Sequence, residues 1–142
     1  MRWVVPVAAG LALLACSSLQ PLPVRMGETC YGCRQVISET KIATEMIDDK
    51  GHAFKFDTVE CLTRYVTDHP DEKINGIFVT DFKTGRLFNA TQAYFVRGSV
   101  MPGGMKKNYV AFRGSDDAAA YARAQNSTTV DWKAVMDALK TS

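Results

Sequence analysis

The stretch IFVTDFKTGRLFNATQAYFVRGS, residues 77–99, decides how the chain is divided. Its runs IFVTDF, RLFNA and QAYFVRGS are rich in β-branched and aromatic residues, which favour strands. The first two runs meet at DFKTG, Asp81 to Gly85, a polar sequence that ends in glycine and is typical of a turn. We therefore predict strands on both sides of this turn and place the boundary between two halves of the fold there.

The residues before this boundary predict the order strand, strand, helix, strand. The runs 40–48 and 52–57 have alternating or β-rich character and flank the turn sequence DDKG, so they predict a hairpin. The apolar spacing then becomes helical, with Asp57 as the expected N-cap and Glu60 in the first turn. The run 74–82 predicts the third strand.

The residues after the boundary repeat this order. The predicted elements are strands at 86–90, 92–99 and 108–114, a helix at 115–125 capped at Ser115, a short strand at 128–130 and a closing helix at 131–139. The expected fold class is therefore α+β, with two small similar ββαβ units in tandem, residues 30–83 and 84–142.

The N-terminus predicts a lipoprotein signal peptide, residues 1–15. An apolar run from Trp3 to Ala15 is too short to span a bilayer and ends in LLAC, which resembles the lipobox of bacterial lipoproteins. Cys16 is therefore the expected lipidation site, although an ordinary secretory signal with an incidental cysteine is the alternative. Residues 16–29 lack periodicity and are expected to form a flexible tether. We expect a periplasmic protein anchored by lipid to the outer membrane rather than to the inner one.

The composition excludes several classes of function. The chain has 142 residues, of which 46% are hydrophobic and 23% charged, as in folded soluble proteins. Its formal net charge is only +2 and no basic stripe appears, so nucleic acid is not an expected partner. No strong acid–base pair, Ser–His–Asp arrangement or phosphate loop stands out, and we expect that the protein is not an enzyme.

Three cysteines remain for the folded part once Cys16 is assigned to lipid. Cys30 and Cys33 form a Cys-x-x-Cys pair, and Cys61 lies beside the apolar stripe of the predicted helix. The pair alone fits a structural disulfide, a redox dithiol or a soft-metal site. An odd number of thiols in an oxidising compartment leaves one unpaired, and such a thiol requires burial, a metal or a redox role. Metal binding is our preferred interpretation.

The loop from Gly98 to Tyr109 carries two methionines, Met101 and Met105, around a Pro-Gly-Gly sequence. Methionine usually fills gaps in a core, but this loop offers little core, and glycine lets the backbone approach another group closely. Thioethers and thiolates are the soft ligands that select Cu(I). The candidate ligands are therefore the cysteine pair and Met105, and the weaker candidates are Cys61, Met101 and Met26.

A series of motifs runs along nearly the whole mature chain. After the lipobox and the Cys-x-x-Cys come FKFDTVECLTRY, IFVTDFKTGRLFNATQAYFVRGS, a Gly-Gly-Met before YVAF, and an alanine-rich helix. This order resembles the NosL family of copper-binding lipoproteins, which are accessory to the assembly of nitrous oxide reductase. The family's fold of two similar ββαβ units agrees with the repeated order above.

The resemblance implies Cu(I) binding through soft ligands and delivery of copper to a periplasmic enzyme such as nitrous oxide reductase, or through a copper-delivery ABC transporter complex. It matches Cys30 and Cys33 to the family's cysteine motif and Met105 to its loop methionine. The chain also departs from the family. Arg34 and Gln35 stand where glycine and methionine are typical, and a leucine follows Cys61 where many members have methionine.

Two other functions stay open from the sequence. One is a thiol–disulfide oxidoreductase that uses Cys30 and Cys33. The other is a lipoprotein that serves as an interaction module, with a structural disulfide and no metal.

Overall fold

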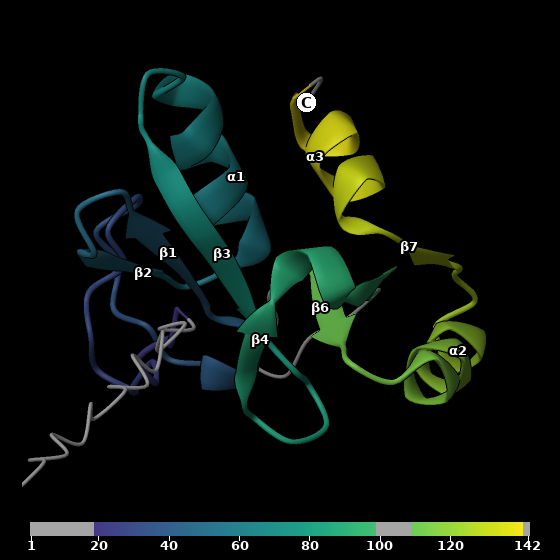
Figure 1. Cartoon of the computed structure of the whole chain (residues 1–142). Helices are drawn as coiled ribbons and strands as arrows, with labels where there is room; N and C mark the ends of the chain where they lie inside the picture. The colour runs from purple at the N-terminus through teal and green to yellow at the C-terminus, as the bar shows by residue number, and fades with distance from the viewer. Residues whose placement is uncertain (1–18, 99–108, 141–142) are drawn as a thin grey trace, which may run out of the picture.

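The computed structural model describes residues 19–98 and 109–140. Over these residues the chain is α+β, with helices packed beside antiparallel sheets (Figure 1). Among the described helices, none has both the length and the apolar character needed to cross a bilayer. The elements, with η for a 3-10 turn, are η1 (Thr40–Ile42), β1 (Thr44–Asp48), β2 (Ala53–Phe56), α1 (Val59–Asp68), β3 (Ile74–Thr80), β4 (Leu87–Asn89), η2 (Ala90–Gln92), β5 (Tyr94–Arg97), β6 (Tyr109–Phe112), α2 (Ser115–Ala124), β7 (Thr129–Val130) and α3 (Trp132–Lys140).

The first unit forms a four-stranded antiparallel sheet in the order β2-β1-β3-β4. Met46 of the central strand β1 lies opposite Phe54 of β2 and Ile77 of β3. It is fully buried and belongs to the same apolar cluster as Leu62 of α1. Because successive side chains of a strand point to opposite faces, α1 covers the face on which Met46 lies.

The second unit repeats this topology in a three-stranded antiparallel sheet, β6-β5-β7. In each unit the first strand is central, the second forms a hairpin with it, and the third returns to its other side after a helix. A 3-10 turn precedes the central strand in both units, and the first of these turns occupies residues predicted as the start of a strand. The structure thus confirms the α+β fold of two similar ββαβ units.

The sequence from Asp81 to Gly85 forms the predicted turn. The Gly85 N–H donates to the Asp81 carbonyl at 2.7 Å, and Gly85 has a φ of +74°, in the region that favours glycine. β4, which follows this turn, pairs with β3, with Phe88 opposite Val79. The first sheet therefore extends past the boundary that the sequence predicts at residues 83 and 84.

Two helices begin one residue away from their predicted caps. The N-cap of α1 is Thr58 rather than Asp57, since the Thr58 hydroxyl accepts a hydrogen bond from the Cys61 N–H at 3.1 Å. The N-cap of α2 is Gly114, and Ser115 is the first helical residue. The first of these shifts matters for function, because it leaves the Asp57 carboxylate available for other contacts.

Residues 19–28 lie across the face of the first sheet opposite α1. The Leu22 N–H donates to Oε1 of Glu45 at 2.9 Å, and the Lys55 ammonium donates to the Pro23 carbonyl at 2.8 Å. Glu45 and Lys55 are directly paired between β1 and β2, one position away from Met46, so they lie on the other face of the sheet. The described part of the predicted tether is therefore attached to the sheet.

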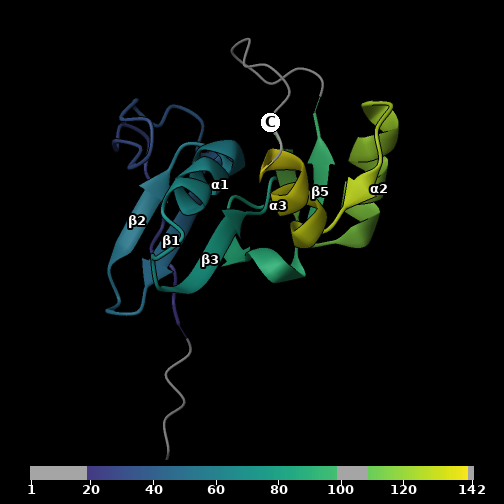
Figure 2. The same cartoon turned by 90° about the horizontal axis from the view of Figure 1, so that it is seen from above.

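Helix α3 lies between the two units (Figure 2). Its Trp132 packs against the apolar cluster of the first unit, which contains Phe56 and Leu62. Trp132 also packs against a second apolar cluster, which combines Val79 of β3 with Phe95 of β5, and its ring centroid lies 5.7 Å from that of Phe95. One side chain therefore contributes to both clusters.

Candidate metal centre

The Cys-x-x-Cys pair lies at the tip of a hairpin-like loop, residues 27–37, here called the cysteine loop. Thr29 and Val36 form an antiparallel bridge, and the Cys30 N–H donates to the Gln35 carbonyl at 2.8 Å. The Arg34 N–H donates in turn to the Cys30 carbonyl at 3.0 Å. These bonds hold the backbone between the cysteines in a tight turn, so both thiols are directed from one short segment.

Two positions in the cysteine loop limit which residue can occupy them, Gly32 through its close contacts and Arg34 through its backbone conformation. A Cβ on Gly32 would lie 3.3 Å from a ring carbon of Phe56 and 3.4 Å from the Cys61 carbonyl oxygen. Glycine therefore lets the loop approach α1 closely. Arg34 has a φ of 65°, in the left-handed region that costs most residues about 1–2 kcal/mol.

Tyr31, between the cysteines, fixes the loop against the first unit. Its ring lies 4.6 Å from that of Phe54 and 5.3 Å from that of Tyr65, measured between centroids. Its N–H also donates to the Lys55 carbonyl at 2.7 Å, which joins the loop to the backbone of β2. The loop is thus held by aromatic contacts to β2 and α1.

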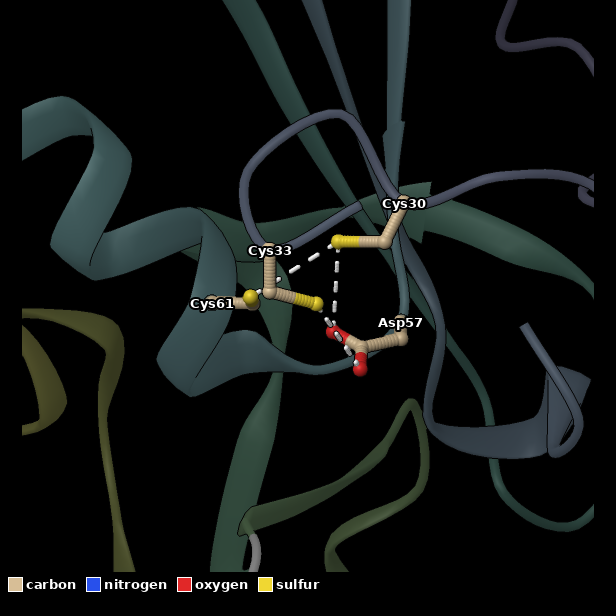
Figure 3. Close-up of side chains that lie close together, drawn as sticks. All are labelled: Cys30, Cys33, Asp57 and Cys61. Carbon is tan, nitrogen blue, oxygen red and sulfur yellow. Dashed lines mark hydrogen bonds between the residues drawn. The ribbon is translucent and has the colours of Figure 1, made fainter. Parts of the chain in front are cut away.

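The other half of the site comes from the start of α1. Cys61 is in the first turn of this helix, where the Thr58 cap holds its N–H. Asp57 precedes the cap, and its carboxylate points toward the cysteine loop (Figure 3). The N-terminus of a helix carries a partial positive charge, which favours negatively charged groups such as thiolates.

Three sulfurs and one carboxylate converge at this point (Figure 3). Sγ of Cys30 lies 3.6 Å from Sγ of Cys61 and 3.4 Å from Oδ1 of Asp57. Sγ of Cys33 lies 3.5 Å from Oδ2 of Asp57. One ligand atom from each of the four residues lies within 4.8 Å of all the others, so a single ion could contact several of them. All three cysteines are free thiols rather than members of a disulfide.

The surroundings keep two of these thiols protonated in the metal-free protein. Burial raises the pKa of the Cys33 thiol, and the nearby Asp57 carboxylate acts in the same direction. Burial also raises the pKa of Cys61, where the neighbouring Cys33 and Asp57 add to the effect. Because a metal binds thiolates, binding at this site must release protons.

The site is reached from a small pocket. Cys30 is fully buried, whereas Cys33 and Cys61 are half-buried. A cavity of about 100 Å³ opens beside the latter two, and its lining residues are Gly32, Cys33, Cys61, Arg64, Tyr65, Asp68 and His69. An ion held here would have one enclosed ligand and two that a partner can approach.

A family model described as NosL matches residues 21–139, which is most of the chain. The chain belongs to the NosL family. No curated protein matches it. The crystal structure of the copper chaperone NosL from Shewanella denitrificans has a TM-score of 0.68 to this structure and 19% sequence identity. The match covers 82% of this chain and 95% of that one, and it shows that the two share a fold.

The site of this NosL family member contains part of the ligand set expected from sequence. Cys30 and Cys33 converge with Cys61, which the sequence ranked as a weaker candidate. Met26 is 74% exposed, in the stretch before the cysteine loop. Met101, Met105 and Cys16 lie outside the described residues, so their roles stay predictions.

The described ends of the methionine-containing loop lie near the site in this NosL fold. Arg97 of β5 pairs with Tyr109 of β6, and the two residues flank that loop. The Tyr109 N–H donates to Oε1 of Glu60 at 2.8 Å, and Glu60 is the neighbour of Cys61. The residue pair that flanks the loop therefore lies beside the first turn of α1.

Asp57 is the residue of the site that sequence reasoning assigned to another role. Asp57 and Thr58 are both good capping residues, and the pattern with Glu60 made Asp57 the expected cap. The sequence did contain a signal that Asp57 has another role. Asp57 and Thr58 follow each other, and only one of the two side chains can cap the helix. The other is then free to face the cysteines.

Proposed function

We propose that this protein is a lipid-anchored periplasmic chaperone that binds Cu(I) and delivers it to a copper-requiring enzyme. The observation that carries the proposal is the convergence of Cys30, Cys33 and Cys61 as free thiols at one point. Membership of the NosL family and the copper chaperone in the solved NosL structure support the choice of metal. Copper is here a cargo, and the protein acts as a carrier rather than as an enzyme.

The donor set favours a soft ion. Thiolates select Cu(I), whereas a carboxylate is a harder ligand that suits other ions better. In the metal-free protein the Asp57 carboxylate accepts hydrogen bonds from the thiols of Cys30 and Cys33. It thereby holds both sulfurs toward the place where an ion would lie. We infer that the three sulfurs bind Cu(I), with Met105 as a further thioether ligand, and that Asp57 positions the thiols.

The unequal burial of the sulfurs fits transfer by ligand exchange. Cys30 is enclosed and can hold the ion while an incoming ligand replaces Cys33 or Cys61 through the adjoining pocket. Each exchange keeps the ion bound to at least one sulfur of the donor. The protein can therefore release copper to a recipient without setting the ion free in solution.

The burial of Cys30 opposes the alternative of a thiol–disulfide oxidoreductase. The attacking cysteine of such a pair is the first one, and a reactive cysteine must be at least partly exposed to meet its substrate. Here Cys30 is fully buried and the more accessible sulfurs are those of Cys33 and Cys61, whose pKa values burial raises. This arrangement fits metal binding better than redox turnover.

The location and the recipient belong to the same proposal. Lipid on Cys16 would hold the protein at a periplasmic membrane surface, at the outer membrane rather than the inner one. The recipient is a periplasmic copper enzyme such as nitrous oxide reductase, reached directly or through a copper-delivery ABC transporter complex. These points rest on the lipobox and on the family resemblance.

Titration of the reduced mature protein with Cu(I) against a chromogenic chelator tests the proposal. We expect stoichiometric uptake by the wild type. Cys30→Ser, Cys61→Ser and Met105→Ala each remove a proposed ligand. Each should weaken affinity at least as much as the roughly 10–100-fold cost of losing an outer-shell partner.

Met136→Leu is the matched control, because it removes a thioether from α3 and should leave affinity unchanged. Wild-type affinity in both Cys30→Ser and Met105→Ala would contradict the assignment. A parallel titration with Zn²⁺ tests metal choice, since three thiolates and a carboxylate can also bind zinc tetrahedrally. Tighter binding of zinc than of Cu(I) would remove copper as the cargo.

A further inference from the structure

We propose that the exposed apolar side chains Leu22, Met26 and Val36 lie directly against the lipid bilayer, so that the cysteine loop is held at the membrane surface with its pocket open. The inference rests on the lipid anchor at Cys16 in the proposed function. It goes beyond that anchor by stating how the folded domain is oriented. The sequence predicted a flexible tether of 16–29, which would leave the domain free to turn in any direction.

The length of free chain sets how far the domain can lie from the anchor. Only Ser17 and Ser18 separate Cys16 from Leu19, the first described residue. Three peptide units span at most about 10 Å. The headgroup region of one leaflet is about 5–8 Å thick, so Leu19 must lie at or close to its outer edge.

Leu19 and the residues after it are attached to the first sheet. A Cβ on Gly76 of β3 would lie 2.6 Å from Cδ2 of Leu19, which shows how closely Leu19 lies over that strand. The Leu22 N–H bonds to buried Glu45, and Pro23 accepts from Lys55. The anchor therefore connects to a fixed surface after two residues rather than to a long tether.

The segment that follows the anchor carries most of the exposed large apolar side chains of the described residues. Among the described residues, the exposed large apolar side chains are Leu22, Met26, Tyr31, Val36 and Tyr94. All except Tyr94 lie between residues 22 and 36. Leu22 is 56% exposed, Met26 74% and Val36 62%. The Thr29–Val36 bridge and the bond from the Gly27 N–H to the Ile37 carbonyl bring the chain at Met26 beside the chain at Val36. Exposed apolar side chains that lie together in this way mark an interaction surface.

The charges of the same segment fit a bilayer with anionic headgroups. Arg25 and Arg34 are exposed beside Met26 and close to Val36 in the chain. The one carboxylate of residues 22–36, Glu28, is paired with Lys55 at 3.0 Å. Apolar side chains flanked by arginines are typical of surfaces that lie in the membrane interface.

Tryptophan fluorescence in the lipidated protein tests this orientation. Protein purified with its lipid is reconstituted into vesicles of phosphatidylethanolamine and phosphatidylglycerol, with or without brominated acyl chains. Met26→Trp and Leu22→Trp place a reporter on the proposed surface, and Tyr94→Trp places one on exposed β5 of the other unit. The native Trp132 background is common to all three.

We expect the Met26→Trp and Leu22→Trp emissions to shift to the blue in vesicles and to lose intensity with brominated lipid, whereas Tyr94→Trp does neither. Equal quenching at all three sites would overturn the inference. A Met26→Trp shift that depends on protein concentration in detergent would indicate a second copy on this surface, and one that appears only with the copper recipient would indicate a protein partner. Either result overturns the proposed contact with lipid.

The test separates this inference from the proposed function. Mass spectrometry reports lipid on Cys16 independently of the fluorescence. Lipidated protein without quenching at residue 26 overturns the orientation and leaves the anchor in place. Protein without lipid on Cys16 removes the anchor and the orientation together. The Cu(I) titration is unaffected by either outcome.

Discussion

Arg34 is the residue of the cysteine loop whose backbone is least suited to its side chain. Its φ of 65° is the conformation that glycine adopts readily, and the NosL resemblance predicts glycine at this position. The backbone strain is partly offset by a favourable contact of the guanidinium, which lies 5.6 Å from the centroid of the Tyr31 ring. The departure from the family in sequence thus coincides with a strained conformation in the structure.

Arg34→Gly should raise the free energy of unfolding by about 0.5–1 kcal/mol. Relief of the left-handed strain gains about 1–2 kcal/mol, and the added freedom of glycine in the unfolded chain removes part of that. Urea denaturation measures the change. Arg34→Ala is the control, because it removes the guanidinium and keeps the strain. If Arg34→Gly is no more stable than Arg34→Ala, the backbone conformation is not the cost.

The sequence predicted the cysteine pair but not the complete group around it. Cys30 and Cys33 are three positions apart in the chain, so their spacing alone made them candidates. Cys61 and Asp57 join them only because the cysteine loop folds back over the start of α1 and Gly32 permits a close approach. Such a contact depends on the tertiary fold, and no local pattern reports it.

At the scale of single elements, the first turn of α1 links helix stability to the site. The Thr58 cap holds the N–H of Cys61 and so fixes where the sulfur of that residue starts. Thr58→Ala should destabilise the protein by about 1 kcal/mol and lower Cu(I) affinity several-fold. Thermal unfolding and the chelator titration measure the two effects.

Thr67→Ala, near the other end of α1, is the matched control for the cap. The Thr67 hydroxyl bonds to the Thr63 carbonyl within the helix, far from the N-terminal turn. This variant should leave Cu(I) affinity unchanged. A Thr58→Ala protein with wild-type stability would show that the cap contributes nothing to α1.

The stability of the first sheet depends on the protonation of Glu45, the residue that accepts the hydrogen bond from Leu22. The Glu45 side chain is fully buried, and burial raises the pKa of its carboxyl above the usual value. A raised pKa means that this group stabilises the fold fully below its unfolded pKa of about 4.3 and that the contribution is lost as pH rises through the folded pKa.

Glu45→Gln should therefore be more stable relative to wild type at pH 7 than at pH 4. Glutamine keeps an oxygen to accept from Leu22 and carries no charge at either pH. Denaturation curves across this range measure the difference. A stability difference that is independent of pH would contradict a raised pKa in Glu45.

Most strands and helices could be predicted from the sequence because their apolar residues have a clear period. The turn at Asp81–Gly85 was also predicted, since its composition is local. The attachment of residues 19–28 was not, because prolines and mixed residues carry no period and the contact with Glu45 is distant in sequence. The pairing of β4 with β3 was missed for a different reason: the turn between them was interpreted as the boundary between two units rather than as the turn of a hairpin.

At the scale of the whole molecule, α3 joins two units that resemble each other. Trp132 packs against two apolar clusters, one of which contains residues of both sheets, so the units share part of their core. Trp132→Ala should lower the free energy of unfolding by about 3 kcal/mol and keep a single unfolding transition. Calorimetry measures both. Lys133→Ala is the control, because Lys133 follows Trp132 in the chain and is exposed. Two resolved transitions in the wild type would show that the units unfold independently.

The repeated topology also gives the metal site a counterpart within the same chain. Cys61 and Asp117 are each the third residue of the helix in their unit. Cys33 and Lys83 precede the first residues of η1 and η2 by the same number of positions. Lys83 and Asp117 form an ion pair at 2.8 Å. Where the first contact brings sulfurs together, the equivalent contact brings together opposite charges, so the same place in the repeated topology holds candidate metal ligands in one case and an ion pair in the other.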